Sequence, residues 1–171
     1  MHIKKMVLCA MFSALICLCA WLAIPIGDIS ITMQTFGIFL CLSLLGGKYG
    51  CISILIYLLL GAVGLPVFSG FQGGMGVLLG TTGGYIWGFL CSGLLFWLIT
   101  GIFGEKSIMI SMILGILICY LLGSLWYVYL YAGGGLSFVL LKCVVPYIIP
   151  DAIKITLALL MRKKLQPFVR D

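Results

Sequence analysis

The chain has 171 residues, of which 64% are hydrophobic and 8% are charged, and its formal net charge is +6. A soluble domain carries about a quarter charged residues, so this composition excludes a water-soluble globular protein and indicates one surrounded by lipid. The basic residues stand at the ends of apolar runs instead of forming a patch, which argues against a nucleic-acid partner. One histidine and eight cysteines without a CxxC pair provide no recognisable metal site.

Long apolar runs without alternation predict membrane-spanning helices, because only helices and closed barrels satisfy the backbone inside a bilayer. We predict an all-α membrane protein with one domain over residues 1–171 and six transmembrane helices. The first apolar run is longer than the core of a signal peptide and no small-residue cleavage site follows it, so we expect it to be retained. The six predicted helices cover residues 6–26, 33–46, 49–63, 82–101, 107–131 and 138–161.

The charges between these helices are distributed unevenly. The predicted loops at 27–32, 64–81 and 132–137 contain no lysine or arginine. Because cytoplasmic segments carry an excess of these residues, the asymmetry predicts that both termini are cytoplasmic. The basic residues assigned to the cytoplasmic side are Lys4, Lys5, Lys48, Lys106, Arg162, Lys163, Lys164 and Arg170.

The segment GLPVFSGFQGGMGVLLGTTGGY, residues 64–85, contains eight glycines and one proline. Such a segment is unsuited to a lipid-exposed helix, so we predict a re-entrant or capping loop over 64–81, between the third and fourth helices. Glycine recurs every fourth residue at Gly80, Gly84 and Gly88. This spacing predicts a flat strip for close helix packing at the start of the fourth helix.

An acidic and a basic residue interrupt the last apolar run. Asp151 precedes Arg162 by eleven residues, which places it roughly 16 Å from that end of a helix. Lys154 is three residues further on and shares its helical face. An ionised group at this depth costs about 3 kcal/mol even on a mild scale, so both groups need partners. Two interpretations follow: the residues pair with each other in a helix that begins at Pro150, or they line a ligand site in which a solute satisfies them.

Four stretches, in order along nearly the whole chain, resemble the biotin-binding BioY family, the substrate-binding S subunits of energy-coupling factor (ECF) transporters. Thr81 stands where that family usually has proline. The resemblance implies six helices, cytoplasmic termini in a bacterial plasma membrane, a pocket on the extracellular side and biotin as the transported ligand, with no cofactor. The stretches are ISITMQTFG (29–37), GAVGLPVFSG (61–70), GTTGGYIWGF (80–89) and IIPDAIK (148–154).

Biotin has a ureido ring with two N–H donors, an apolar thioether ring and a carboxylate tail. For such a ligand we expect Asp151 to accept ureido N–H bonds and Lys154 to neutralise the carboxylate or to orient Asp151. We expect two aromatic side chains to form walls and three polar ones to complete the site, although the threonine among them is equally suited to cap a helix. These additional candidates are Phe68, Tyr85, Gln72, Gln34 and Thr32.

The resemblance also implies partners, namely a transmembrane coupling subunit and two cytoplasmic ATPases. S subunits dock through an Ala-x-x-x-Ala face on the first helix, and Ala10 and Ala14 match this spacing, although a chance pair of small residues has the same pattern. Three alternatives remain at this point: an S subunit for another small vitamin, a membrane-embedded enzyme using Asp151, and a purely structural subunit. We expect no enzymatic activity, because no P-loop, HExxH or GxSxG motif is present.

Overall fold

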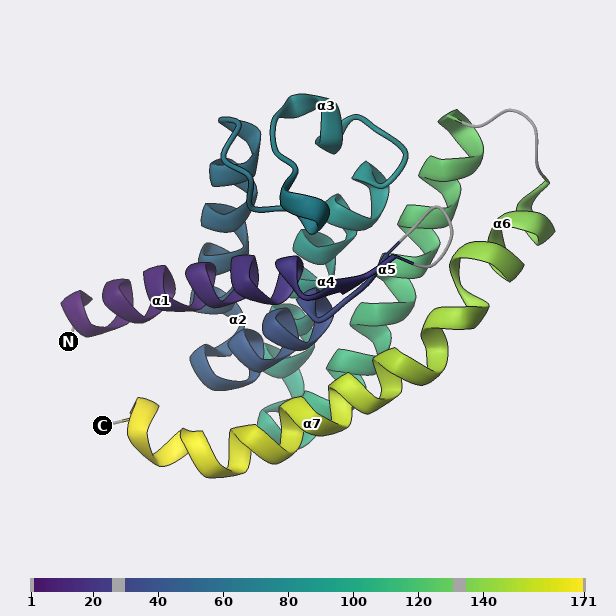
Figure 1. Ribbon diagram of the computed structural model, residues 1–171. Helices are drawn as coiled ribbons and strands as arrows, with labels where there is room; N and C mark the ends of the chain where they lie inside the picture. Colours follow the sequence, from purple (N-terminus) through teal and green to yellow (C-terminus); the bar gives the residue numbers. More distant parts are fainter. Residues whose placement is uncertain (1, 26–29, 131–134, 171) are drawn as a thin grey trace.

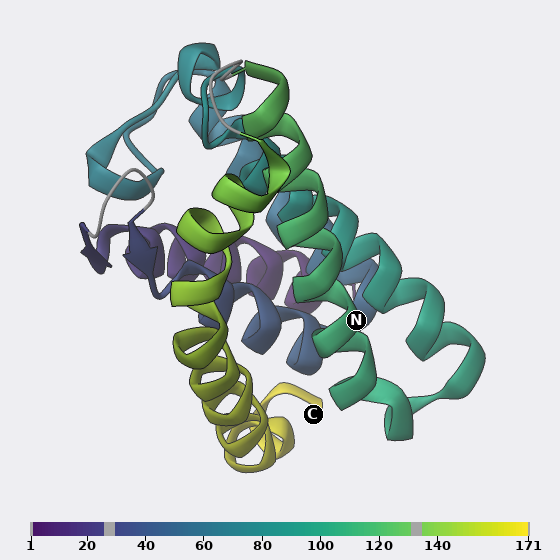
Figure 2. The same ribbon diagram turned by 90° about the vertical axis from the view of Figure 1, so that its right-hand side faces the viewer.

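The computed structural model describes residues 2–25, 30–130 and 135–170, and most of them are helical. The predicted loops 27–32 and 132–137 therefore lie partly outside the described residues. Figures 1 and 2 show long helices packed around one another, with the start of α1 and the end of α7 on the same side of the molecule. The elements are α1 (His2–Trp21), β1 (Ala23–Ile24), β2 (Ile31–Thr32), α2 (Gln34–Ala62), the 3-10 turn η1 (Ser69–Phe71), α3 (Met75–Leu78), α4 (Gly83–Phe103), the 3-10 turn η2 (Glu105–Ser107), α5 (Ile108–Leu130), α6 (Leu136–Cys143) and α7 (Val145–Arg170).

The predicted second and third helices are a single element with a sharp break. Helix α2 is non-helical only at Gly46, where φ is +77° and ψ is 170°. A residue with a side chain is strained at this positive φ, whereas glycine adopts it readily. The break thus lies at the predicted end of the second helix, residue 46, and one glycine is enough to turn the chain between the two halves. In Figure 1 the two halves of α2 run in different directions on either side of this break.

The predicted glycine strip packs α4 against α5. A methyl group added at Gly84 would lie 2.2 Å from the Cβ atom of Trp126, and one at Gly88 would lie 3.0 Å from the Cα atom of Cys119. Gly80 takes part through its carbonyl oxygen, which accepts a hydrogen bond of 3.0 Å from the Trp126 indole. The absence of side chains at this strip thus allows two helix backbones to approach closely.

The last predicted helix is interrupted, although not where its prolines suggest. The break lies at Val144, between α6 and α7, and the two helices differ in direction by 43°. Pro150 lies inside α7, which begins at Val145, so the prediction of a helix starting at Pro150 was wrong. Asp151 consequently lies in the second turn of α7 and not at its first residue.

Four of the described helices are long and apolar enough to cross a membrane: α1, α2, α4 and the helix that includes η2 and α5. A fifth is obtained if the bent pair α6 and α7 is counted as one broken span. This count does not confirm the six predicted spans, because α2 enters it as one helix. Many large side chains at the surface are apolar, among them Leu18, Leu55, Leu98 and Leu121, which is the expected pattern for a protein that faces lipid.

Basic residues from both ends of the chain, Lys5 and Arg162, and the acidic Glu105 from its middle line a second cavity of about 420 Å³. Arg162 forms an ion pair with Glu105 (3.0 Å) and donates a hydrogen bond to the Ser43 carbonyl (3.1 Å). The Lys5 ammonium lies 4.9 Å from the centre of the Tyr49 ring. The start of α1, the break in α2, the turn between α4 and α5 and the end of α7 therefore meet at one end of the molecule.

Candidate functional site

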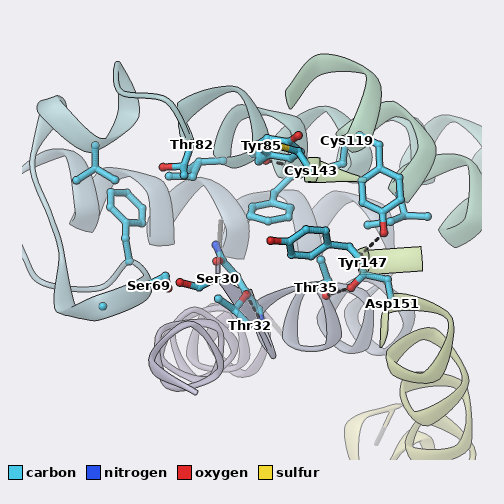
Figure 3. Close-up of a pocket in the computed structure, with 18 of the residues that line it drawn as sticks. Ser30, Thr32, Thr35, Ser69, Thr82, Tyr85, Cys119, Cys143, Tyr147 and Asp151 are labelled. Atoms are coloured by element: carbon cyan, nitrogen blue, oxygen red, sulfur yellow. Dashed lines mark hydrogen bonds between the residues drawn. The ribbon is translucent and has the colours of Figure 1, made fainter. Parts of the chain in front are cut away.

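A cavity of about 250 Å³ lies away from this basic end, enclosed by the start of α2, the segment 68–77, α4, α5 and the junction of α6 and α7. The structure brings all seven predicted substrate-binding residues to its wall, although they are distributed over more than 120 positions of the sequence. Figure 3 shows Thr35 beside Asp151 on one side of this cavity, with Tyr85 on the other. The seven residues are Thr32, Gln34, Phe68, Gln72, Tyr85, Asp151 and Lys154.

Asp151 and Lys154 form a buried ion pair at the wall of the cavity. Each residue is 5% exposed, and the Lys154 ammonium lies 2.8 Å from Oδ1 of Asp151. The same oxygen accepts a hydrogen bond of 2.9 Å from the hydroxyl group of Thr35. The Tyr120 hydroxyl donates to Oδ2. Helical spacing explains the first contact, whereas α2 and α5 supply the other two.

These contacts correct one part of the sequence interpretation. The alternatives were a pair that satisfies itself and a pair satisfied by a solute, and the structure combines features of both. Protein groups already provide both carboxylate oxygens with donors, so the hydrogen bonding of the carboxylate does not depend on a ligand. Asp151 and Lys154 nevertheless line the cavity. The site is thus preorganised, and a ligand would meet a carboxylate whose orientation is already set.

Gln34 and Thr32 surround the beginning of α2. The side-chain amide of Gln34 donates a hydrogen bond of 2.8 Å to the Tyr57 hydroxyl, and both residues are buried. The Thr32 hydroxyl accepts a bond of 3.3 Å from the backbone N–H of Gln34, next to the first turn of the helix. The predicted N-cap role of Thr32 was wrong, because Met33 is the N-cap residue of α2 and no side chain caps it. Thr32 instead forms this local turn contact before the helix and lines the cavity.

Phe68 and Tyr85 are the two predicted aromatic walls, and both are held by close contacts with glycine. The Phe68 ring lies against Gly61, where an added Cβ atom would be 2.0 Å away, and meets the Tyr57 ring edge-on at 5.5 Å. The Tyr85 ring similarly covers Gly123 of α5. These contacts leave each aromatic ring little freedom, so the walls of the cavity are rigid.

The predicted capping loop contains two short helical elements, η1 and α3, and α3 lies at the top of Figure 1. The loop lines the cavity through residues between 68 and 77. Phe68 and Gln72 pair as an isolated β-bridge, in which the N–H of Phe68 donates to the carbonyl of Gln72 at 2.9 Å. This bridge closes the tight turn Ser69–Phe71. It also holds Phe68 and Gln72 side by side at the cavity wall.

Sequence reasoning missed several residues of the cavity. Thr35 is part of the quoted stretch ISITMQTFG, so its motif was available as a signal even though its contact with Asp151 was not. Tyr120 lies in an uninterrupted apolar run, where nothing in the sequence distinguishes it from other lipid-embedded tyrosines. Tyr147 and Cys143 come from the junction of α6 and α7, and their place depends on the unpredicted bend. The remaining polar residues at the wall are Ser30, Ser69, Thr82 and Cys119.

The predicted docking residues lie elsewhere. Ala10 and Ala14 are exposed on α1, on the same outward face as Met11 and Leu18. The opposite face of α1, which includes Ser13 and Ile16, is buried against α2. Ser13 bonds the carbonyl of Ser53 at 2.8 Å across this contact. The face of α1 that bears Ala10 and Ala14 is thus apolar and exposed.

Comparisons with known proteins agree with this geometry. The chain is 38% identical over 166 residues to the "Probable biotin transporter BioY" of Pyrococcus horikoshii, covering 97% of this chain and 98% of that protein. It is 42% identical over 104 residues to the "Biotin transporter BioY" of Thermotoga maritima, covering 61% and 59% of the two chains.

A crystal structure of the S-component for biotin from an ECF-type ABC transporter has the same fold. Its TM-score is 0.87 at 29% sequence identity, and the match covers 97% of this chain and 92% of that chain. A sequence model of the BioY family matches residues 1–171. Fold, cavity and sequence agree, and the chain belongs to the BioY family.

Proposed function

We propose that this chain binds biotin and is the substrate-capture S subunit of an ATP-driven ECF-type importer. The observation that carries the proposal is the cavity itself, in which a preorganised buried carboxylate and ammonium face two rigid aromatic walls. This combination suits a ligand with polar groups attached to a compact apolar ring. The relatives are named transporters, which argues against the alternative of an enzyme that uses Asp151.

The hydrogen bonds around Asp151 suggest how the ureido ring is bound. A carboxylate has about four acceptor positions, and protein donors from Thr35, Lys154 and Tyr120 use three of them. The remaining position, on Oδ2, is suited to one ureido N–H as a charge-assisted hydrogen bond. Lys154 then has the orienting role, since its ammonium is in direct contact with Asp151.

The rings and the tail of the ligand have separate candidate partners. Phe68 and Tyr85 are the walls for the apolar thioether ring, and Gln72 approaches the ligand from the capping loop. Gln34 and Thr32 complete the polar lining at the start of α2. Lys154 has three ammonium protons, so it is also the candidate to neutralise the ligand carboxylate while it retains its bond to Asp151.

We further propose six membrane passes in a single integral-membrane domain over residues 1–171. The arrangement of the two cavities supports this, because the first half of α2, α4, α5 and α7 each contribute residues to both cavities, and the break at Gly46 divides α2 into two helices. Positively charged residues face the cytoplasm, so both termini are assigned to the cytoplasmic side of a bacterial plasma membrane. The segment 64–81 is then the capping loop over an outward-facing site.

The proposed partners are a transmembrane coupling subunit and two cytoplasmic ATPases. Ala10 and Ala14 provide the candidate docking face, because their small side chains allow another helix backbone to approach α1. Capture and energy supply are then separate: this chain holds biotin from the outside, and the partner complex drives its release to the cytoplasm.

Binding of labelled biotin to the purified protein tests the proposal. We expect saturable binding with one site per chain, and a thermal-shift panel of small vitamins in which biotin gives the largest stabilisation. A larger shift with a different vitamin would favour the alternative S subunit. Absence of binding by every vitamin in the panel would overturn the assignment of the cavity.

A further inference from the structure

The last residue of α1 is attached to the capping loop by two independent contacts. The indole Nε1–H of Trp21 donates a hydrogen bond of 2.7 Å to the carbonyl of Pro66. The same indole stacks on the Phe71 ring, with the ring centres 5.0 Å apart and the planes inclined by 28°. Residues 66 and 71 lie on either side of Phe68, the aromatic wall that the loop contributes to the cavity.

Phe71 is held in an unfavourable conformation at this contact. Its φ is +58°, and it is the only residue other than glycine with a positive φ in the part of the chain that the structure describes. A bulky residue avoids this region of backbone space. Its side chain is also 64% exposed, so burial in the core does not hold it there. The Phe71 side chain instead stacks on Trp21, and this contact is the candidate for what holds the strained turn in place.

The turn has a direct connection to the ligand site. The β-bridge between Phe68 and Gln72 encloses the turn that contains Phe71, and both bridge residues line the cavity. Release of the Phe71 ring from Trp21 would allow the turn to relax and Gln72 to move with it, whereas the Phe68 ring stays packed on Gly61. Gly64, Gly70 and Gly74 of the same loop also have positive φ values, which suit glycine and mark tight turns on either side of this contact.

We infer that Trp21 is a positioning residue that latches the capping loop over the cavity and thereby slows ligand dissociation. The inference rests on the proposed function and adds a regulatory role at the same site. Trp21 ends the helix that bears the outward docking face, so a partner that displaces α1 would act on the element that holds the loop closed. The latch requires no contact between Trp21 and the ligand.

The test is the dissociation rate of labelled biotin from the full-length protein in nanodiscs. Trp21→Phe keeps an aromatic ring for stacking and removes the N–H donor, and we expect dissociation to be about three to ten times faster. Phe71→Leu keeps the backbone strain and the apolar character but removes the stack, with a similar expected effect. Phe71→Tyr retains the stack and should dissociate like the unmodified chain.

Association rates and melting temperatures without ligand separate a latch from a general structural role. We expect the melting temperature of Trp21→Phe to stay close to that of the unmodified chain, because the lost hydrogen bond is solvent-exposed, and the association rate not to fall, because the substitution does not obstruct the cavity. Trp97→Phe is the matched control, since it removes an indole from an exposed position on α4 (46% exposed). Equal dissociation rates in Trp21→Phe, Phe71→Leu and the unmodified chain would overturn the latch. A rate increase in Trp97→Phe equal to that in Trp21→Phe would also overturn it.

Biotin binding by the unmodified chain distinguishes a failure of the proposed function from a failure of the latch. If it fails to bind biotin, the proposed function is contradicted, and the latch for biotin with it. If it binds biotin and the latch variants dissociate at the same rate as the unmodified chain, only the latch is contradicted. Phe71 is on the surface, so its variants provide the test even if substitution of Trp21 prevents folding.

Discussion

Replacement of Asp151 by asparagine perturbs both the stability of the protein and the binding of the ligand at the centre of the site. The Lys154 ammonium is 2.8 Å from Oδ1, which gives a Coulomb attraction of roughly 6 kcal/mol at an effective dielectric constant of about 20. Desolvation of the two ions offsets much of this, so the net contribution of the pair is small. Removal of one partner alone has a larger effect than this small net contribution, because it leaves the other charge buried without a counter-ion at a cost of about 3–5 kcal/mol.

Asparagine also changes the hydrogen bonding of the site. Its amide nitrogen is a donor and would face a donor hydroxyl, either that of Thr35 or that of Tyr120, where the carboxylate now accepts. The loss of a charge-assisted bond to the ureido ring costs about 1.5–3 kcal/mol, or a rise in Kd of roughly 10- to 150-fold. We therefore expect Asp151→Asn to lower both the melting temperature and the affinity for biotin.

The double variant Asp151→Asn/Lys154→Met distinguishes these two effects. It removes the uncompensated charge, so we expect most of the lost stability to return while the affinity stays low. Equilibrium binding of labelled biotin gives Kd, and thermal unfolding without ligand gives the stability of each variant. An unchanged Kd in either variant would refute the role of Asp151 as ligand acceptor. Retained function with apolar residues at both positions would favour a purely structural pair.

Three further predictions concern the surroundings of the site. Gly84→Ala should destabilise the α4–α5 contact by about 1–3 kcal/mol, because the new methyl group would meet a side chain of α5 at 2.2 Å, whereas Gly101→Ala, with open space, should leave the melting temperature unchanged. Tyr120→Phe removes a donor to Asp151 and should weaken biotin binding severalfold without loss of expression, as measured by equilibrium binding; an unchanged Kd would contradict it. Ala14→Trp should abolish ATP-driven uptake in proteoliposomes with the coupling subunits while biotin binding persists, and undiminished uptake would exclude this face as the docking site.

The sequence was informative wherever local spacing determines geometry. The three-residue interval between Asp151 and Lys154 predicted a shared helical face, and the structure confirms it. The interval of the glycines in α4 similarly predicted close packing with another helix. Each of these features depends only on the period of the α-helix, so no knowledge of the tertiary fold was required.

Features that depend on distant segments could not be predicted in the same way. Thr35 is 116 positions from Asp151 and Tyr120 is 31 positions away, so no local pattern connects them. The predicted end of the second helix coincides with the break at Gly46. The apolar runs on both sides of Gly46 do not indicate that a single residue is enough to change the direction of the chain. The short hairpin that pairs Ala23 with Thr32 and Ile24 with Ile31 was not predicted, since two-residue strands have no recognisable period.

The internal compensation of Asp151 and Lys154 has an electrical consequence. The negative charge of Asp151 and the positive charge of Lys154 cancel in the ion pair. A membrane potential therefore exerts no net force on the pair when the site is empty. A bound ligand with a carboxylate adds one negative charge, and each 100 mV across the bilayer then contributes about 2.3 kcal/mol. An interior-negative voltage opposes inward movement of that loaded form, and a source of energy other than this voltage must overcome it.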